Sequence, residues 1–140
     1  MSELIYSVFQ RSYQVEAKLI GSKNFPPLTR TAKNIQETSQ SFFGLWSSKR
    51  LAGVIEVELS GLTLSICSLV VDPDFFRQGV ASQLIDFLVK SLDYQEAYVE
   101  TAVANLPAIK LYQKHGFTEV KQWTPQHGIK KIQLKAFKNI

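Results

Sequence analysis

Residues 64–92, LSICSLVVDPDFFRQGVASQLIDFLVKSL, contain a strand, a loop and a helix in that order. The apolar run at residues 66–71 has the character of a strand, and Asp72-Pro73 ends it. From Gly79 onward, apolar residues recur at spacings of three and four, which gives a helix with one buried face: Val80, Leu84, Phe87, Leu88 and Leu92.

The start of this helix has free backbone N–H groups and the positive end of the helix dipole, so it suits an anion such as a pyrophosphate. Gly79 and Ala81 are small enough to let a ligand approach the backbone closely. The alternative is that Gly79 serves only the turn between the strand and the helix.

A second block, residues 105–117 (NLPAIKLYQKHGF), predicts a helix that ends at Gly116. Asn105 suits an N-cap and Pro107 suits a first helical turn. Tyr112 lies on one stripe with Ala108, Leu111 and His115, so these residues alone allow either a core aromatic or a functional phenol.

Both blocks resemble the signatures of the GNAT superfamily of acyl-CoA-dependent N-acyltransferases. There, a strand ending in V-x-P precedes a Q/R-x-x-G-x-G/A loop. Here Val71-Asp72-Pro73 precedes residues 76–81 (FRQGVA), with Phe76 at the leading Gln or Arg position and the basic residue one place later, at Arg77. The second block matches N-x-x-A-x-x-L-Y-x-x-x-G-F at every defined position, and the resemblance covers roughly residues 52–137.

The resemblance implies one α/β (α+β) domain over residues 1–140 with a twisted, mostly antiparallel sheet of six or seven strands and about four helices. The strands before the two helices should be parallel and splayed. Family members usually begin with a strand before the first helix. In this chain that strand is either missing or supplied by residues 2–5, because residues 4–20 predict a helix with Leu4, Val8, Val15 and Leu19 at helical spacing.

By the same resemblance, the chain transfers an acetyl group from acetyl-CoA to an amine by direct attack on the thioester. Tyr112 is then the general acid. Tyr112 lies beside the coenzyme sulfur, and the strand edge at Leu69, Val70 and Val71 holds the pantetheine arm. The pyrophosphate lies on Arg77, Gln78, Gly79, Val80, Ala81 and Ser82, with Asn105 nearby.

Glu100 is the first candidate for the general base. It lies twelve residues before Tyr112, where the similar ribosomal-protein N-terminal acetyltransferases carry their base, although an exposed strand carboxylate is an equal interpretation. Glu56, Glu58 and His127 are the alternatives and are candidates for acceptor binding. Because Glu56 and Glu58 alternate with apolar residues, their face of the strand meets either solvent or a cleft for a cationic amine.

The remaining segments complete the predicted fold. Phe25, Pro26 and Pro27 form either a rigid wall of the acceptor site or a packed loop, and residues 29–40 predict a polar helix. Strands are expected at residues 42–46, 51–59, 63–71, 96–103, 118–124 and 129–137. Cys67 is expected to be a small apolar residue of a buried strand, since no His or Asp partner can be assigned to make it a nucleophile.

The composition limits the other function classes. The 140 residues carry a net charge of +4 and are 45% hydrophobic, with no apolar run near the about 20 residues of a membrane span, so a cytoplasmic protein is expected. One cysteine and two distant histidines predict no metal site. The charge suits coenzyme A, and the lack of a basic block with aromatics disfavours nucleic acid. The rival interpretation is a non-catalytic acetyl-CoA sensor or oligomerisation domain; the acceptor and a homodimer stay open.

Overall fold

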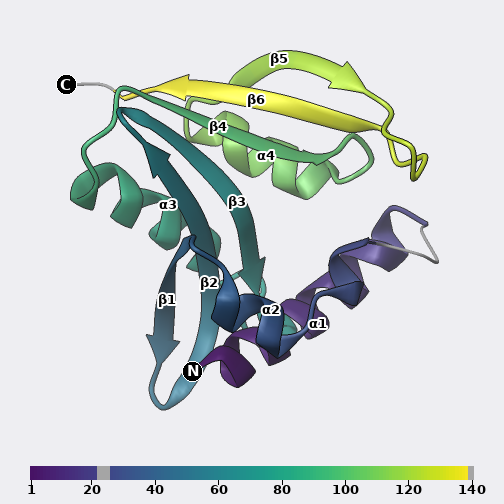
Figure 1. Ribbon diagram of the computed structural model, residues 1–140, viewed down its shortest axis with the longest axis vertical. Helices are drawn as coiled ribbons and strands as arrows, with labels where there is room; N and C mark the ends of the chain where they lie inside the picture. Colours follow the sequence, from purple (N-terminus) through teal and green to yellow (C-terminus); the bar gives the residue numbers. More distant parts are fainter. Residues whose placement is uncertain (22–25, 139–140) are drawn as a thin grey trace.

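The computed structural model describes residues 1–21 and 26–138 (Figure 1). Its helices are α1 (Ser2–Leu19), α2 (Ala32–Glu37), α3 (Val80–Ser91) and α4 (Leu106–Lys114), with 3₁₀ turns at Pro26–Thr29 and Pro73–Phe75. Its strands are β1 (Ser41–Ser47), β2 (Arg50–Ser60), β3 (Thr63–Val71), β4 (Glu96–Ala102), β5 (Thr118–Trp123) and β6 (Lys131–Phe137). Among the described residues, no helix is long and apolar enough to cross a bilayer.

The six strands form one sheet in the order β1-β2-β3-β4-β6-β5. All neighbouring strands are antiparallel except β3 and β4, which are parallel and precede α3 and α4, so the predicted parallel pair is confirmed. The pairing of β3 with β4 runs only from Thr63–Glu96 to Ile66–Val99. Beyond that point the two strands separate, and Figure 1 shows the two halves of the sheet opening apart.

Helices cover both faces of the sheet, as the alternation of side chains along β2 requires. Ile55 belongs to the larger core, which joins the sheet to α3 and α4. Its neighbour Val54 points to the opposite face and belongs to a smaller core beneath α1 and α2, with Ile5, Val8, Phe9, Ile35, Leu51 and Val70. Burying each large apolar side chain contributes about 1.5–3 kcal/mol, so each layer is fixed by its own core.

Gly53 of β2 explains why the start of α3 lies so close to the sheet. A side chain at this position would place its Cβ 2.6 Å from Cγ1 of Val80 and 3.1 Å from the carbonyl oxygen of Val70. Only glycine therefore lets the first turn of α3 pack directly on β2, and this contact positions the loop between β3 and α3.

Several boundaries differ from those that the sequence predicts. Residues 2–5 lie in α1, so they supply no strand. The helix expected at residues 29–40 is only six residues long, because Thr31 caps it: its hydroxyl accepts from the N–H of Asn34, whose side chain accepts from the N–H of Thr31. Pro26 begins a 3₁₀ turn, whose first positions tolerate proline.

The buried face of α1 also differs from the expected one. Leu4, Val15 and Leu19 are 49%, 40% and 52% exposed, so three of the four residues chosen for the inner face point outward. The buried residues of this helix are Ile5, Val8, Phe9 and Ala17. The helix itself is confirmed, but its orientation is not the one that the most obvious apolar spacing favours.

Candidate active site

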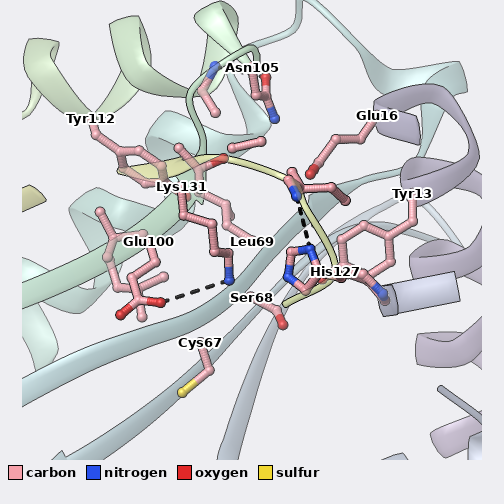
Figure 2. Close-up of a pocket in the computed structure, with 17 residues that line it drawn as sticks. Tyr13, Glu16, Cys67, Ser68, Leu69, Glu100, Asn105, Tyr112, His127 and Lys131 are labelled. Atoms are coloured by element: carbon pink, nitrogen blue, oxygen red, sulfur yellow. Dashed lines mark hydrogen bonds and ion pairs between the residues drawn. The ribbon is translucent and has the colours of Figure 1, made fainter. Parts of the chain in front are cut away.

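The separation of β3 from β4 creates the candidate site. Along β2, Glu56 pairs with Ser68 and the next residue pairs with Ile66, so Cys67 bulges out of the ladder. The edge of β3 from this bulge to Val71 has no pairing with β4. A cavity of about 270 Å³ lies in the gap (Figure 2). Its wall includes Tyr13, Glu16, Cys67, Ser68, Leu69, Glu100, Asn105, Tyr112, His127 and Lys131.

Tyr112 comes from the buried face of α4 and is only 5% exposed. Its ring packs edge-on against Phe117, with 5.7 Å between the ring centroids. Burial raises the pKa of Tyr112 well above its ordinary value of 10. The phenol is therefore protonated at neutral pH and is able to act as a proton donor to a group in the cavity.

Asn105 combines the two roles that the sequence allows. It is 8% exposed, and its side-chain Oδ1 accepts a hydrogen bond of 3.3 Å from the N–H of Ala108, so it caps α4. It also contributes to the cavity wall. The cap fixes the first turn of the helix that carries Tyr112, which makes the position of the phenol depend on this loop.

The loop between β3 and α3 has the backbone geometry of an anion site. Arg77 and Gly79 have φ angles of +63° and +75°, the left-handed region that favours glycine. A Cβ at Gly79 would meet no atom within 4 Å, so the space above the loop is open. Because α3 begins at Val80, its first N–H groups have no carbonyl partner within the helix. Binding of a pyrophosphate at residues 77–82 stays a prediction.

Two arginines attach this loop to the rest of the fold. Asp72 is 5% exposed and accepts hydrogen bonds from the N–H of Asp74 at 2.9 Å and from Arg11 of α1 at 2.8 Å. Arg50 of β2 bonds to Asp74 at 2.8 Å. The turn after β3 is thus tied to both α1 and β2, which stabilises the approach to Gly79.

Glu100 and His127 lie on the same cavity wall as Tyr112, as a shared role would require. The carboxylate of Glu100 is 44% exposed and lies 3.8 Å from Nζ of Lys131. His127 is held by the backbone, because its Nδ1 accepts a hydrogen bond of 3.2 Å from the N–H of Ile129. Of the predicted wall residues before α2, Pro27 lines the cavity, and Phe25 lies outside the described residues.

Glu56 and Glu58 lie in different environments. Glu56 faces neither solvent nor a cleft for an amine, which were the two expected alternatives. Glu56 is 1% exposed and forms a bidentate pair with Arg30, with distances of 2.6 and 2.8 Å. It meets neither solvent nor the cavity, because Arg30 and the helices α1 and α2 cover this part of the sheet. Glu58, opposite Ser65, is exposed and is not on the cavity wall.

Cys67 is exposed rather than buried, because the bulge turns it toward the gap. Desolvation, together with the negative charges of Glu56 and Glu58, raises the pKa of its thiol to about 11. Little thiolate is present at neutral pH, so the structure agrees with discounting this cysteine as a nucleophile.

Sequence reasoning missed two residues of α1 that reach the cavity. The hydroxyl of Tyr13 hydrogen-bonds to Ser68, and burial raises the pKa of Tyr13 to about 12. Glu16 points into the cavity, where burial raises its pKa to about 7 (Figure 2). The available signal was their spacing: Ile5, Phe9, Tyr13 and Glu16 form one helical stripe.

Comparison with known proteins agrees with this architecture. Residues 14–136 match the family model described as an acetyltransferase (GNAT) domain. UPF0157 protein YqkA of Bacillus subtilis is 34% identical over 119 residues, which cover 84% of this chain and 35% of that protein. The chain therefore spans about a third of the length of this relative.

The ribosomal-protein-S18-alanine N-acetyltransferase of Escherichia coli is 28% identical over 113 residues, covering 77% of this chain and 73% of that protein. Its crystal structure superposes with a TM-score of 0.79 over 99% of this chain and 88% of that chain, at 20% identity. The structure of the PaiA N-acetyltransferase of Thermoplasma acidophilum in complex with coenzyme A superposes with a TM-score of 0.71. The superposition covers 97% of this chain and 92% of that chain, at 15% identity. The family match, the sheet with its single parallel pair and the gap at β3 agree: this chain belongs to the GNAT acetyltransferase domain family.

Proposed function

We propose that this chain transfers the acetyl group of acetyl-CoA to a primary amine. The observation that carries the proposal is the gap between β3 and β4, where an unpaired strand edge leads from the loop at Gly79 to the phenol of Tyr112. The residues present fit the co-substrate. The β3 edge offers N–H and C=O groups to the amides of the pantetheine arm, and the start of α3 offers N–H groups to the pyrophosphate.

The reaction requires a proton donor for the departing sulfur and an acceptor for the proton of the amine. Acetyl-CoA supplies an acetyl thioester, which a neutral amine attacks directly. In our proposal Tyr112 donates its proton to the sulfur as the C–S bond breaks, since the raised pKa keeps this phenol protonated. Glu100 is the first candidate to hold the cationic amine, with His127 as the alternative, because both lie on the cavity wall and Glu58 does not. Glu56 is occupied by Arg30.

The proposed acceptor class is an amine that is cationic in solution, because carboxylates stand at the cavity wall. An N-terminal α-amine of a peptide is the first candidate, since the E. coli relative is named for acting on the alanine of ribosomal protein S18. Small amines are the second candidate. A second hollow, which includes Ile20 and Gly128 in its lining, shares His127 and Ile129 with the cavity and offers space for an extended acceptor.

The test is a free-thiol release assay with acetyl-CoA and a panel of acceptors: peptides with free N-termini, peptides with an internal lysine, polyamines, aminoglycosides and amino acids. We expect thiol release above the hydrolysis background with at least one class. Calorimetry with coenzyme A runs in parallel and gives the affinity of the co-substrate. Binding without thiol release over the panel would support the sensor interpretation, and the absence of binding would refute the proposal.

A further inference from the structure

The second half of α1 faces the cavity rather than the sheet. Ile5, Val8 and Phe9 of the first half are buried in the smaller core. One and two turns later, the same face carries Tyr13 and Glu16, which lie above the gap between β3 and β4. Figure 2 shows Glu16 reaching into the cavity from α1, across from Glu100 on β4. A carboxylate thus occupies a helix position whose stripe is otherwise apolar or aromatic.

Glu16 differs from Glu56 and Glu100 in the contacts of its carboxylate. Within residues 1–21 and 26–138, this carboxylate makes no hydrogen bond and no ion pair within 4.0 Å, and the charge of Lys131 acts on it from farther away, whereas Glu56 binds Arg30 and Glu100 lies 3.8 Å from Lys131. Burying a charged group costs free energy unless it is paired. Glu16 is half-buried and belongs to neither core, and its place on the cavity wall beside Tyr112 is typical of a group kept for its reactivity.

We propose that Glu16 is the general base of the transfer reaction, an inference that rests on the proposed function. A carboxylate oxygen of Glu16 takes a proton from the acceptor ammonium, and the freed lone pair of the nitrogen forms the bond to the acetyl carbon. The C–S bond breaks, and the sulfur takes the proton of Tyr112. The acylated nitrogen releases its second proton, which restores Tyr112 through water, and Glu16 returns its proton to solvent at the mouth of the cavity.

Glu16 suits this step better than Glu100. Glu100 is 44% exposed and lies 3.8 Å from Nζ of Lys131, so a cation already stands beside its carboxylate, and its part in the reaction is to attract the ammonium. Desolvation raises the pKa of Glu16 to about 7, with Lys131 offsetting part of the effect, so its strength matches a neutral working pH. The groups facing it from the surrounding elements are Tyr13, Cys67, Glu100, Tyr112, His127 and Lys131.

The test compares Glu16→Gln with Glu100→Gln and with Glu3→Gln, an exposed control on the same helix. The kinetics use the most active acceptor of the panel between pH 5.5 and 9. We expect Glu16→Gln to lower kcat by about 10²- to 10⁴-fold at pH 7.5 and to remove the acid limb of the profile, with KM for acetyl-CoA within twofold. Glu100→Gln should raise KM for the amine and keep that limb, and Glu3→Gln should match the wild type.

A second measurement, independent of turnover, is a ¹³C NMR titration of the side-chain carboxyls. The carboxyl signal that is missing from the spectrum of Glu16→Gln is assigned to Glu16. This carboxyl should titrate near pH 7 in the free protein and at lower pH with a bound amine. If Glu16→Gln keeps the wild-type rate and acid limb, or if Glu100→Gln alone removes the limb, the proposal is wrong while the transferase activity stands. No thiol release by the wild type with any amine would instead refute the proposed function.

Discussion

The unpaired carboxylate of Glu16 should make the protein less stable as the pH rises from about 5 to 7. Burial raises its pKa from the ordinary value of 4.5 to about 7. Between these values the folded protein retains a proton on Glu16 that the unfolded chain has lost, so the free energy of unfolding falls as pH increases through this window. Glu16→Gln removes the ionising group and keeps nearly the same shape.

The expected change in the free energy of unfolding follows from the difference between the pKa of Glu16 in the folded and unfolded states. Full ionisation of Glu16 in the folded state costs about 2–3 kcal/mol, allowing for the contact that the side chain keeps with water. Below about pH 4.5 this cost is absent, and above about pH 7 it is complete. We therefore expect Glu16→Gln to gain about 2–3 kcal/mol relative to the wild type on going from pH 4.5 to pH 8.

The measurement is urea unfolding of both proteins between pH 4.5 and 8.5, followed by fluorescence of the two tryptophans. Subtracting one curve from the other cancels every other titrating group that the substitution leaves unchanged. A difference between Glu16→Gln and the wild type that stays constant over this pH range would refute the inference that this half-buried carboxylate is costly to ionise.

Three further predictions concern other parts of the site. Tyr112→Phe should lower kcat by about 10²- to 10⁴-fold while changing stability by only about 1 kcal/mol, measured by thiol release and urea unfolding; a wild-type rate would reduce Tyr112 to a packing residue. Gly79→Asp should bind coenzyme A at least about tenfold more weakly than Gly79→Asn, which has nearly the same shape and strain but no charge; equal affinities in calorimetry would move the pyrophosphate elsewhere. Arg30→Met should cost about 3–5 kcal/mol because it leaves Glu56 buried and unpaired, and adding Glu56→Gln should recover part of that loss in a double-mutant cycle, whereas additive losses would mean that the two residues are not coupled.

The two motif blocks predicted the part of the fold that is determined locally. The strand, breaker and helix of residues 64–92 and the capped helix after Asn105 each contain their own start and stop signals. These features were accessible because each depends on residues within one or two turns of each other. The parallel pair of β3 and β4 was instead implied by the family resemblance of the two blocks, and the structure confirms it.

The orientation of α1 was not accessible in the same way. This helix has apolar residues on more than one side, so the 3.6-residue period fits a stripe through Leu4 and Val15 as well as one through Ile5 and Phe9. The correct stripe continues into Tyr13 and Glu16, which are polar and therefore weakened the pattern that would have identified it. Tertiary contact with the smaller core, and not local spacing, decides which side is buried.

The environment of Glu56 shows a second limit of prediction from the sequence. Alternation along β2 placed its side chain on a definite face, but the partner that covers it, Arg30, lies 26 residues earlier, just before the capped turn at Thr31. Cys67 was misplaced for a related reason, because a single-residue bulge reverses the alternation after it. Long-range ion pairs and bulges are set by three-dimensional packing, which a single sequence does not encode as a period.

Because β3 and β4 pair over only a short stretch, the sheet consists of two halves that are joined at one end. Backbone pairing of Thr63–Ile66 with Glu96–Val99 joins the two halves, and a hydrogen bond from the N–H of Gln95 to the carbonyl of Leu62 extends it by one residue. A linear molecule whose amides bind the unpaired edge of β3 lengthens the pairing between the two halves, so it acts as an additional strand. The free energy of folding and the occupancy of the gap are then linked: at a concentration of 100 times its Kd, such a ligand adds about 2.7 kcal/mol to the stability of the domain.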